Sequence, residues 1–153
     1  MVNTAVNLSG VSLENPVIPA SGTFGFGYEF AQWYDINCLG AISVKGTTRE
    51  PRFGNPAPRI AETTGGMLNA VGLQNPGIDV FIERDIPFLQ KFDTKIIVNV
   101  CGNSVSDYLQ VVERLSETVV DMLEINISCP NVEHGGIAFG QEPKMVEYIT
   151  SEI

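Results

Sequence analysis

The sequence predicts an α/β protein organised as the N-terminal half of a (β/α)8 barrel, with a short N-terminal β-hairpin and a long insert after the second barrel strand. Continuous apolar runs, which are typical of strands buried on both faces, alternate with helical segments. Each run also ends in side chains capable of chemistry. The carboxyl ends of the strands carry the active site in a barrel of this class.

The N-terminal segment contains the predicted hairpin and the first of four apolar runs. "TAVNL" and "VSLEN" flank a turn at Ser9 and Gly10, which predicts two short paired strands. The run "PVIPASG", residues 16–22, ends in small residues that include Ser21, and we interpret it as the first barrel strand. A short helical stretch is expected around residues 28–34.

Three further apolar runs complete the predicted strands. They are "AISVKG" at residues 41–46, ending at Lys45 and Gly46; "KIIVNV" at residues 95–100, carrying Asn99; and "MLEINIS" at residues 122–128, carrying Asn126 and leading to Cys129. A start resembling a capping box at Ser104 and Asp107 predicts a helix between the last two runs. Its apolar residues recur at helical spacing, at Tyr108, Val111, Val112 and Leu115.

Residues 47–76 form a long insert rich in glycine and proline. Its segment "TTGGMLNAVGLQNPG" combines glycines with Asn69, Gln74 and Asn75. Glycines allow a backbone to approach a flat ligand closely, and loops of this length are often functional. A flexible loop has the same composition, so the insert alone does not decide between the two.

The last predicted element is a helix that begins at Pro143 and has Met145, Val146 and Ile149 on one face. The chain stops at Ile153 inside this helix, with no C-cap. Four strands are half of the eight that a barrel needs. We therefore expect residues 1–153 to form one partial barrel domain of a chain that continues or once continued.

Composition and charge exclude several classes of function. The chain has 153 residues, a net charge of −9 and a pI near 4.4, which argues against nucleic acid or an anionic membrane as a partner. No apolar run approaches the length of a membrane span, and the N-terminus lacks the features of a signal peptide. Three cysteines without CxxC spacing and a single histidine predict neither a disulfide framework nor a metal site, so a cytoplasmic location is expected.

The polar residues at the strand ends suggest proton and anion chemistry. Cys129 follows a strand and precedes a Pro-Asn turn, which favours a general base over an acyl-transfer nucleophile, because His134 is the sole histidine and lies in a glycine-rich loop. Lys45 is a candidate cation for an anionic ligand or a reduced cofactor. Asn99 and Asn126 suit the amide or imide edge of a heterocycle. An inert buried thiol, a solvated lysine and turn-forming asparagines are the alternatives for these positions.

Five segments taken together resemble one known family. "PASGTFGFG", "SVKGTT", "GGMLNAVGLQNPG", "IVNV" and "NISCPNVEHGGIAFG" occur in the order found in class one dihydroorotate dehydrogenases, and the resemblance covers essentially the whole chain. The resemblance implies an FMN-containing β/α barrel that oxidises dihydroorotate to orotate in pyrimidine biosynthesis.

The resemblance also implies roles for individual residues. Cys129 would remove a proton from C5 of dihydroorotate while a hydride leaves C6 for flavin N5; class two members have serine at this position. The residues implied in flavin binding are Ser21, Lys45, Gly46, Asn99 and Asn126. Those implied in substrate binding are Lys45, Asn69, Ala70, Val71, Gly72, Leu73 and Asn126, with Asn131 supporting the same site.

The segment "NVEHGGIAFG" resembles the type B branch of class one more than the fumarate-using type A branch. Type B catalytic subunits form a homodimer core and pair with an electron-transfer subunit that carries FAD and a [2Fe–2S] cluster and reduces NAD⁺. Three cysteines are too few to hold such a cluster with four thiolates. The resemblance therefore implies that any cluster lies on the partner subunit.

Two alternative functions remain open at this stage. A flavoenzyme of the dihydropyrimidine dehydrogenase type, acting on uracil or thymine, would share a cysteine base and asparagine-rich ring recognition. An inactive truncated half-barrel is the other alternative, because the family's second half, with its FMN phosphate loops, is absent from residues 1–153. Such a half-barrel would expose strand edges and an apolar face, which predicts association.

Overall fold

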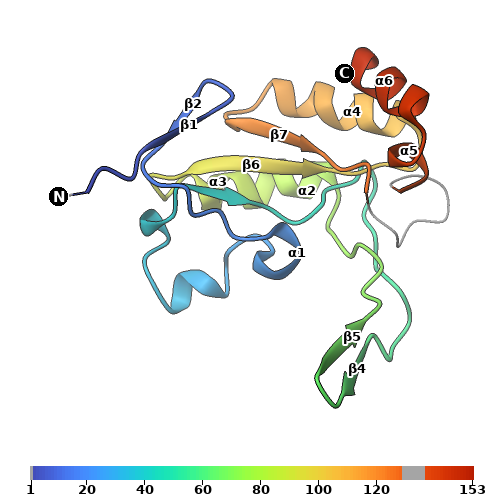
Figure 1. Ribbon diagram of the computed structural model, residues 1–153, viewed down its shortest axis with the longest axis horizontal. Coiled ribbons are helices and arrows are strands. Elements are labelled where there is room, and N and C mark those ends of the chain that lie inside the picture. The colour runs from blue at the N-terminus through green and yellow to red at the C-terminus, as the bar shows by residue number, and fades with distance from the viewer. Residues whose placement is uncertain (1, 129–136) are drawn as a thin grey trace.

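The structure is a computed structural model that describes residues 2–128 and 137–153. Its central element is a parallel three-stranded sheet in the order β3-β6-β7 (Figure 1). The strands are β3 (Ala41–Ser43), β6 (Lys95–Val100) and β7 (Met122–Ile125). The three apolar runs predicted to form these strands are thus confirmed as neighbours in one parallel sheet.

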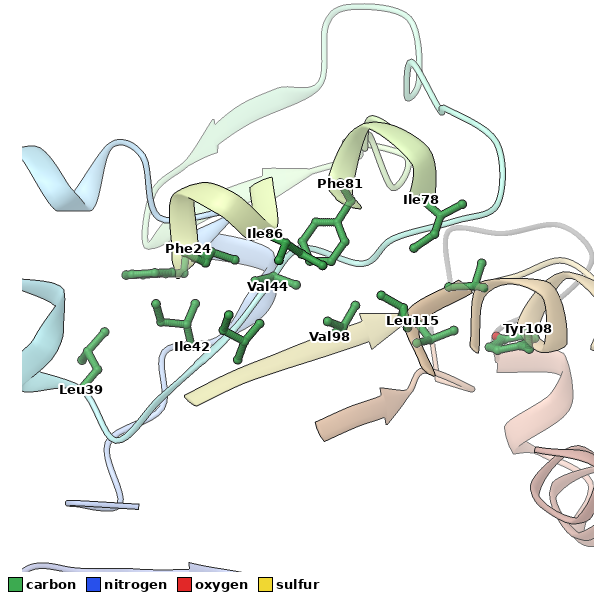
Figure 2. Packing of buried hydrophobic residues seen from close by; sticks show 14 of the residues in the cluster. Phe24, Leu39, Ile42, Val44, Ile78, Phe81, Ile86, Val98, Tyr108 and Leu115 are labelled. Carbon is green, nitrogen blue, oxygen red and sulfur yellow. The ribbon is translucent and has the colours of Figure 1, made fainter. Parts of the chain in front are cut away.

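One face of this sheet is covered by helices. Five β-strand or strand-end side chains on it are at most 4% exposed: Ile42, Val44, Ile96, Val98 and Val100. They pack against two helical segments, as Figure 2 shows for Val44 and Val98 beside Phe81 and Ile86. The cluster on this outer face contains most of the buried apolar side chains of the described residues. Burying one such side chain contributes about 1.5–3 kcal/mol to the free energy of folding.

The first helical segment on the outer face runs from α2 (Ile78–Val80) through a π-helical turn, η3 (Phe81–Asp85), into α3 (Ile86–Leu89). Pro87 lies in the first turn of α3 and has no N–H to donate to the preceding helical turn. A proline within a continuous helix therefore coincides here with the widened π-turn. The turn brings Phe81 and Asp85 to the interior, where both are fully buried.

The second helix on this face is α4 (Val105–Ser116), and its predicted capping box is confirmed. The Ser104 hydroxyl accepts a hydrogen bond from the Asp107 N–H at 3.2 Å, and the Asp107 carboxylate accepts one from the Ser104 N–H at 3.2 Å. These bonds satisfy two of the N–H groups that a helix start leaves without partners. Tyr108, Val111 and Leu115 are buried against the sheet, as their spacing predicts.

The N-terminal strands lie beneath the opposite, inner face of the sheet. β1 (Val6–Leu8) and β2 (Val11–Leu13) pair antiparallel around Ser9 and Gly10, which both have positive φ. Leu13 is 2% exposed and packs with Ala41 and Ile97 from the amino-terminal part of the inner face. A small second core therefore closes this end of the sheet.

The structure differs from the sequence prediction at the first apolar run. Residues 16–20 form no strand, and the helix α1 (Ser21–Phe24) begins at Ser21. Pro16 and Pro19 flank Val17 and Ile18 and remove two ladder donors, which disfavours a strand inside a sheet. The described residues thus contain three parallel strands rather than the four predicted.

Two short 3-10 helices follow α1. They are η1 (Phe30–Gln32) and η2 (Ile36–Cys38). The first of them lies within the predicted helical stretch at residues 28–34.

The long insert is ordered around a second hairpin. β4 (Ile60–Thr63) and β5 (Gly66–Asn69) pair antiparallel and project away from the parallel sheet (Figure 1). All residues of this hairpin are exposed. The parts of the insert on either side of the hairpin return to the carboxyl ends of the strands, where the cleft described below lies.

The described C-terminal segment contains α5 (Ile137–Gly140) and α6 (Pro143–Glu152). α6 lies beside α4 (Figure 1), begins at Pro143 as predicted, and buries Ile149 completely. Phe139 meets Tyr108 edge-to-face, with ring centroids 6.0 Å apart. Within the described ranges, no helix has the length and apolar character needed to cross a membrane.

Candidate functional site

The inner face of the sheet becomes polar toward the carboxyl ends of its strands. Alternate residues share a face, so the inner series reads Ala41, Ser43, Lys45 along β3 and beyond; Ile97, Asn99 along β6; and Met122, Glu124, Asn126 along β7 and beyond. Ser43 donates to the Glu124 carboxylate at 2.8 Å across the face of β6. The same gradient on three strands gathers the polar groups at one edge.

At this edge the structure brings Asn99 and Asn126 into direct contact. The Asn126 side-chain Nδ2 donates to Asn99 Oδ1 at 3.0 Å, and Asn99 is only 2% exposed. The backbone of Asn126 is held from two sides, because its N–H donates to the Val100 carbonyl at 2.9 Å and its carbonyl accepts from the Tyr108 hydroxyl at 2.6 Å. Both amides are therefore fixed by the sheet and by α4.

The turn after β3 brings Lys45 and Gly46 to the same edge. The Lys45 N–H donates to the Gly25 carbonyl at 2.9 Å, which ties the α1 loop to the strand end. A Cβ at position 46 would lie 2.8 Å from the sulfur of Cys101 and 3.0 Å from Asn99 Oδ1. Only glycine allows the backbone to pass this close to the two side chains.

A cleft of about 770 Å³ opens beside this turn. Its lining includes Gly22, Thr23 and Gly25 from the α1 loop, Lys45, and Asn69, Val71, Gly72, Leu73 and Asn75 from the insert. Lys45, Arg52 and Arg84 line it with Glu29, so three of the chain's nine lysines and arginines face one cleft. In a chain of net charge −9, this local excess of cations favours an anionic ligand.

Three of the four backbone carbonyl groups of residues 70–73 accept hydrogen bonds, and several of the N–H groups are available. The Asn55 side-chain Nδ2 donates to the Ala70 carbonyl at 2.9 Å, and the Asn55 backbone N–H donates to the Val71 carbonyl at 3.0 Å. Asn75 Nδ2 donates to the Leu73 carbonyl at 2.9 Å. Gly72 and Leu73 have positive φ values of 79° and 56°. Within the described part of the chain, the N–H groups of Val71, Gly72 and Leu73 have no acceptor, so this segment can bind an anion.

Three side chains that support this segment were not assigned a role from the sequence. Asn75 is 5% exposed, and its Oδ1 accepts from the N–H groups of Thr48 and Gly77 at 3.1 and 3.0 Å. The Arg59 guanidinium donates to the carbonyls of Asn55 and Phe53 and to the side chain of Gln74. Asn55 and Arg59 connect the start of the insert to residues 70–74, fifteen positions further along the chain. The only sequence feature that could have pointed to Arg59 was the presence of an arginine in an insert rich in glycine and proline.

A second unpredicted network borders the cleft at Arg84. The fully buried Asp85 carboxylate accepts from the Arg84 Nε and Nη2 at 2.9 and 3.0 Å and from the Tyr28 hydroxyl at 2.7 Å. Burial raises the pKa of Tyr28 above its ordinary 10.0, and the hydrogen bond to Asp85 raises it further. The same carboxylate raises the pKa of Arg84. Asp85 thus fixes the guanidinium at the wall of the cleft.

The remaining predicted site residues are only partly accounted for by this geometry. Ser21 is the first residue of α1, and its neighbours Gly22 and Thr23, rather than Ser21 itself, line the cleft. Ala70 is likewise next to lining residues without lining the cleft itself. Cys129, Asn131 and His134 lie outside the described residues. Among residues 2–128 and 137–153, no group of three or more His, Cys, Asp or Glu side chains could hold a metal ion.

A parallel α/β sheet with polar side chains gathered at the carboxyl ends of its strands is the arrangement of β/α-barrel, or TIM-barrel, enzymes. The candidate site combines a cleft lined by cations with the Asn99–Asn126 pair at the same strand ends. The pair does not line the cleft itself, and the Lys45–Gly46 turn lies between the two. The chain belongs to the dihydroorotate dehydrogenase family, whose sequence model matches residues 3–153.

Individual relatives agree with this assignment. The chain is 63% identical over 152 residues to the catalytic subunit of dihydroorotate dehydrogenase B (NAD(+)) from Lachnoclostridium phytofermentans, covering 99% of this chain and 51% of the relative. It is 59% identical to the subunit of the same name from Alkaliphilus metalliredigens, covering 99% and 50%. These names confirm the predicted resemblance to the type B branch. The chain spans about half the length of these curated relatives.

A solved structure shows the same fold. The crystal structure of DHODH in complex with ferulenol from Eimeria tenella superposes with a TM-score of 0.75 at 25% sequence identity. The match covers 97% of this chain and 42% of the Eimeria chain. The predicted relation to a barrel of this family is therefore supported over nearly all of the sequence.

Proposed function

We propose that this chain provides the N-terminal half of the catalytic barrel of a type B dihydroorotate dehydrogenase. This oxidoreductase converts dihydroorotate to orotate in pyrimidine biosynthesis and passes the electrons to NAD⁺. The observation that carries the proposal is the Asn99–Asn126 pair, 3.0 Å apart, beside the Lys45–Gly46 turn at the carboxyl ends of the strands. The high identity to subunits of that name over the whole chain supports it.

The residues at this edge suit the ring of a flavin, and we propose FMN as the cofactor. A bound flavin supplies the hydride acceptor for the oxidation. Asn99 and Asn126 present amide donors and acceptors to a ring edge, and Lys45 presents a cation that stabilises negative charge on the reduced ring. A Cβ built at Gly22 or Gly25 meets nothing within 4 Å, so the α1 loop next to Ser21 leaves open space for the cofactor.

The insert suits the carboxylate and ring of the substrate. Val71, Gly72 and Leu73 offer backbone N–H groups, and Asn69 and Lys45 line the same cleft. A dihydroorotate carboxylate bound there would lie in the cleft that Lys45 also lines. Uracil and thymine have no carboxylate, so these groups favour dihydroorotate over the substrates of a dihydropyrimidine dehydrogenase.

We assign the base to Cys129, three residues after Asn126. Its thiolate takes the proton from C5 of dihydroorotate, and the hydride leaves C6, so the C5–C6 bond becomes the double bond of orotate. Both electrons leave the substrate with the hydride, and the cysteine carries away only a proton. Cys129→Ala should therefore nearly abolish substrate oxidation and leave flavin binding unchanged.

The proposed function includes a second subunit. The name of the relatives, a catalytic subunit, supports a separate partner, and the resemblance to type B enzymes suggests that a [2Fe–2S] cluster and FAD would reside on an electron-transfer subunit bound to a homodimer of catalytic chains. We propose a cytoplasmic location for this assembly, where thiols remain reduced.

The test is a visible absorption spectrum of the protein after incubation with FMN and removal of unbound flavin. We expect a retained flavin spectrum that bleaches when dihydroorotate is added without oxygen. Cys129→Ala should retain the flavin and stay oxidised. Cys38→Ala changes an exposed cysteine that precedes the amino end of β3, opposite the carboxyl ends where the candidate site lies, and this variant should bleach normally. Reduced flavin that uracil reoxidises, while dihydroorotate has no effect on the oxidised form, would contradict the proposal. A colourless protein would mean that the other half of the barrel is needed to hold FMN and that the activity belongs to the longer chain.

A further inference from the structure

Cys101 lies at the centre of the proposed site without a role in the proposed chemistry. It follows β6 directly, is 2% exposed, and its thiol donates to Asn99 Oδ1 at 3.3 Å. Its side chain also packs against Leu73, which belongs to the insert and lines the cleft. Cys101 therefore touches both a residue proposed to bind flavin and a residue proposed to bind substrate.

The amide of Asn99 needs such a neighbour to have a defined orientation. The oxygen and nitrogen of a carboxamide are similar in size, so hydrogen bonds determine which of them points in a given direction. Here two donors, the Cys101 thiol and Asn126 Nδ2, meet the same Oδ1 atom at 3.3 and 3.0 Å. A rotated amide would place its own N–H groups against both donors.

The opposite side of the amide is the one available to a ligand. Within the described residues, Asn99 Nδ2 has no acceptor, and every fully buried side-chain nitrogen or oxygen has a partner. Asn99 Nδ2 is consequently open to a ligand that brings an acceptor, such as a ring nitrogen or carbonyl oxygen.

We propose that Cys101 is a positioning residue, whose thiol fixes the Asn99 amide so that Nδ2 donates to an acceptor on the flavin ring. This inference rests on the proposed flavin-binding function. The space for the thiol is set by Gly46, where a Cβ would come within 2.8 Å of the sulfur and 2.9 Å of Leu73 Cδ1. A side chain with a donor and little bulk is required at position 101, which cysteine provides.

The first arm of the test uses the ligand-free protein and the side-chain amide resonances of Asn99 in ¹H–¹⁵N spectra. Cys101→Ser keeps a donor and should leave the two Asn99 amide protons as distinct, sharp signals. Cys101→Ala removes the donor and should shift and broaden them. Cys38→Ala, at the exposed cysteine, is the matched control and should change neither signal. Unaltered Asn99 signals in Cys101→Ala would overturn the positioning role.

The second arm measures FMN dissociation constants by fluorescence titration. Losing one hydrogen bond should weaken binding about fivefold in Cys101→Ala and much less in Cys101→Ser. In an Asn99→Ala background the same Cys101→Ala change should have no further effect, because its route to the flavin is gone. A fivefold loss that persists in this background would show a packing role and overturn the proposal.

The two arms separate this inference from the proposed function. If the parent protein binds no FMN, the proposed FMN binding fails for residues 1–153 by themselves, and the Asn99 resonances alone decide the role of Cys101. If the parent binds FMN and the Asn99 signals ignore Cys101→Ala, the proposed function stands and the positioning role fails.

Discussion

Val98 and Asn99 are neighbours in β6, both are buried, and their side chains lie on opposite faces of the sheet. Val98 joins the apolar cluster beneath the helices and has only dispersion and hydrophobic partners. Asn99 faces the inner side, where Cys101 and Asn126 satisfy its oxygen. Burial of Val98 on the outer face therefore stabilises the fold. Burial of Asn99 on the inner face instead holds a polar side chain in a fixed orientation for a ligand.

The largest expected effect comes from placing the same charge on each face. Val98→Asp buries a carboxylate among apolar side chains and should reduce the free energy of unfolding by about 4 kcal/mol, if the variant folds at all. Asn99→Asp keeps the shape and both donors to the inner oxygen, so its cost should be about 1 kcal/mol. Urea unfolding followed by circular dichroism measures both. Equal losses would contradict the distinction between the faces.

A smaller effect is expected where the insert meets the strand ends. Asn75→Ala leaves the Thr48 and Gly77 N–H groups without their acceptor and should cost about 2 kcal/mol. Amide exchange should accelerate at Thr48 and Gly77 and stay slow in β6, because the damage is confined to the loop. Met67→Ala, at an exposed position of the β4–β5 hairpin, is the control. Faster exchange throughout β6 would mean that the insert supports the sheet itself.

The capping box of α4 should contribute less. Ser104→Ala removes the side-chain acceptor for the Asp107 N–H and should lower the free energy of unfolding by about 1 kcal/mol. Ser106→Ala lies in the exposed first turn of the same helix and should stay within about 0.5 kcal/mol of the parent. Indistinguishable urea midpoints for the two variants would show that the cap is unimportant for the outer face.

The smallest effect concerns pH at the wall of the cleft. The pKa of Tyr28 is raised in the folded state, so the neutral phenol is favoured there. The resulting stability is fully present below the ordinary pKa of 10.0 and is lost as pH rises through the folded-state pKa. Subtracting the alkaline ultraviolet titration of Tyr28→Phe from that of the parent should give a midpoint above 10.0. A midpoint at or below 10.0 would contradict the raising of this pKa by burial and by the Asp85 carboxylate.

The sequence predicted those parts of the molecule that rest on local pattern. The runs containing Ile42, Val98 and Leu123 are strands because each is a short apolar segment bounded by polar residues, and Ser104 marks a helix start through its own backbone. The run at residues 16–22 was predicted wrongly, because its apolar character outweighed the two prolines that remove ladder donors.

The site was predictable only as far as strand ends reveal it. The position of Lys45, Asn99 and Asn126 at one edge of the sheet follows from the rule that polar site residues lie at the carboxyl ends of parallel strands. The Arg59–Asn55 contacts and the Tyr28–Asp85 hydrogen bond join residues through the fold and leave no periodic signal in the sequence. From the sequence, Cys101 could be described only as a cysteine that follows a strand. Its proposed positioning role depends on the hydrogen bond to Asn99, which only the structure reveals.

The most direct test of the central claim is a crystal structure of the protein with FMN. The account predicts the flavin ring at the inner edge of the sheet, with an acceptor atom within hydrogen-bond distance of Asn99 Nδ2 and with Lys45 beside the ring. A flavin bound elsewhere on the chain, with Asn99 and Asn126 left in contact only with each other and with solvent, would contradict it.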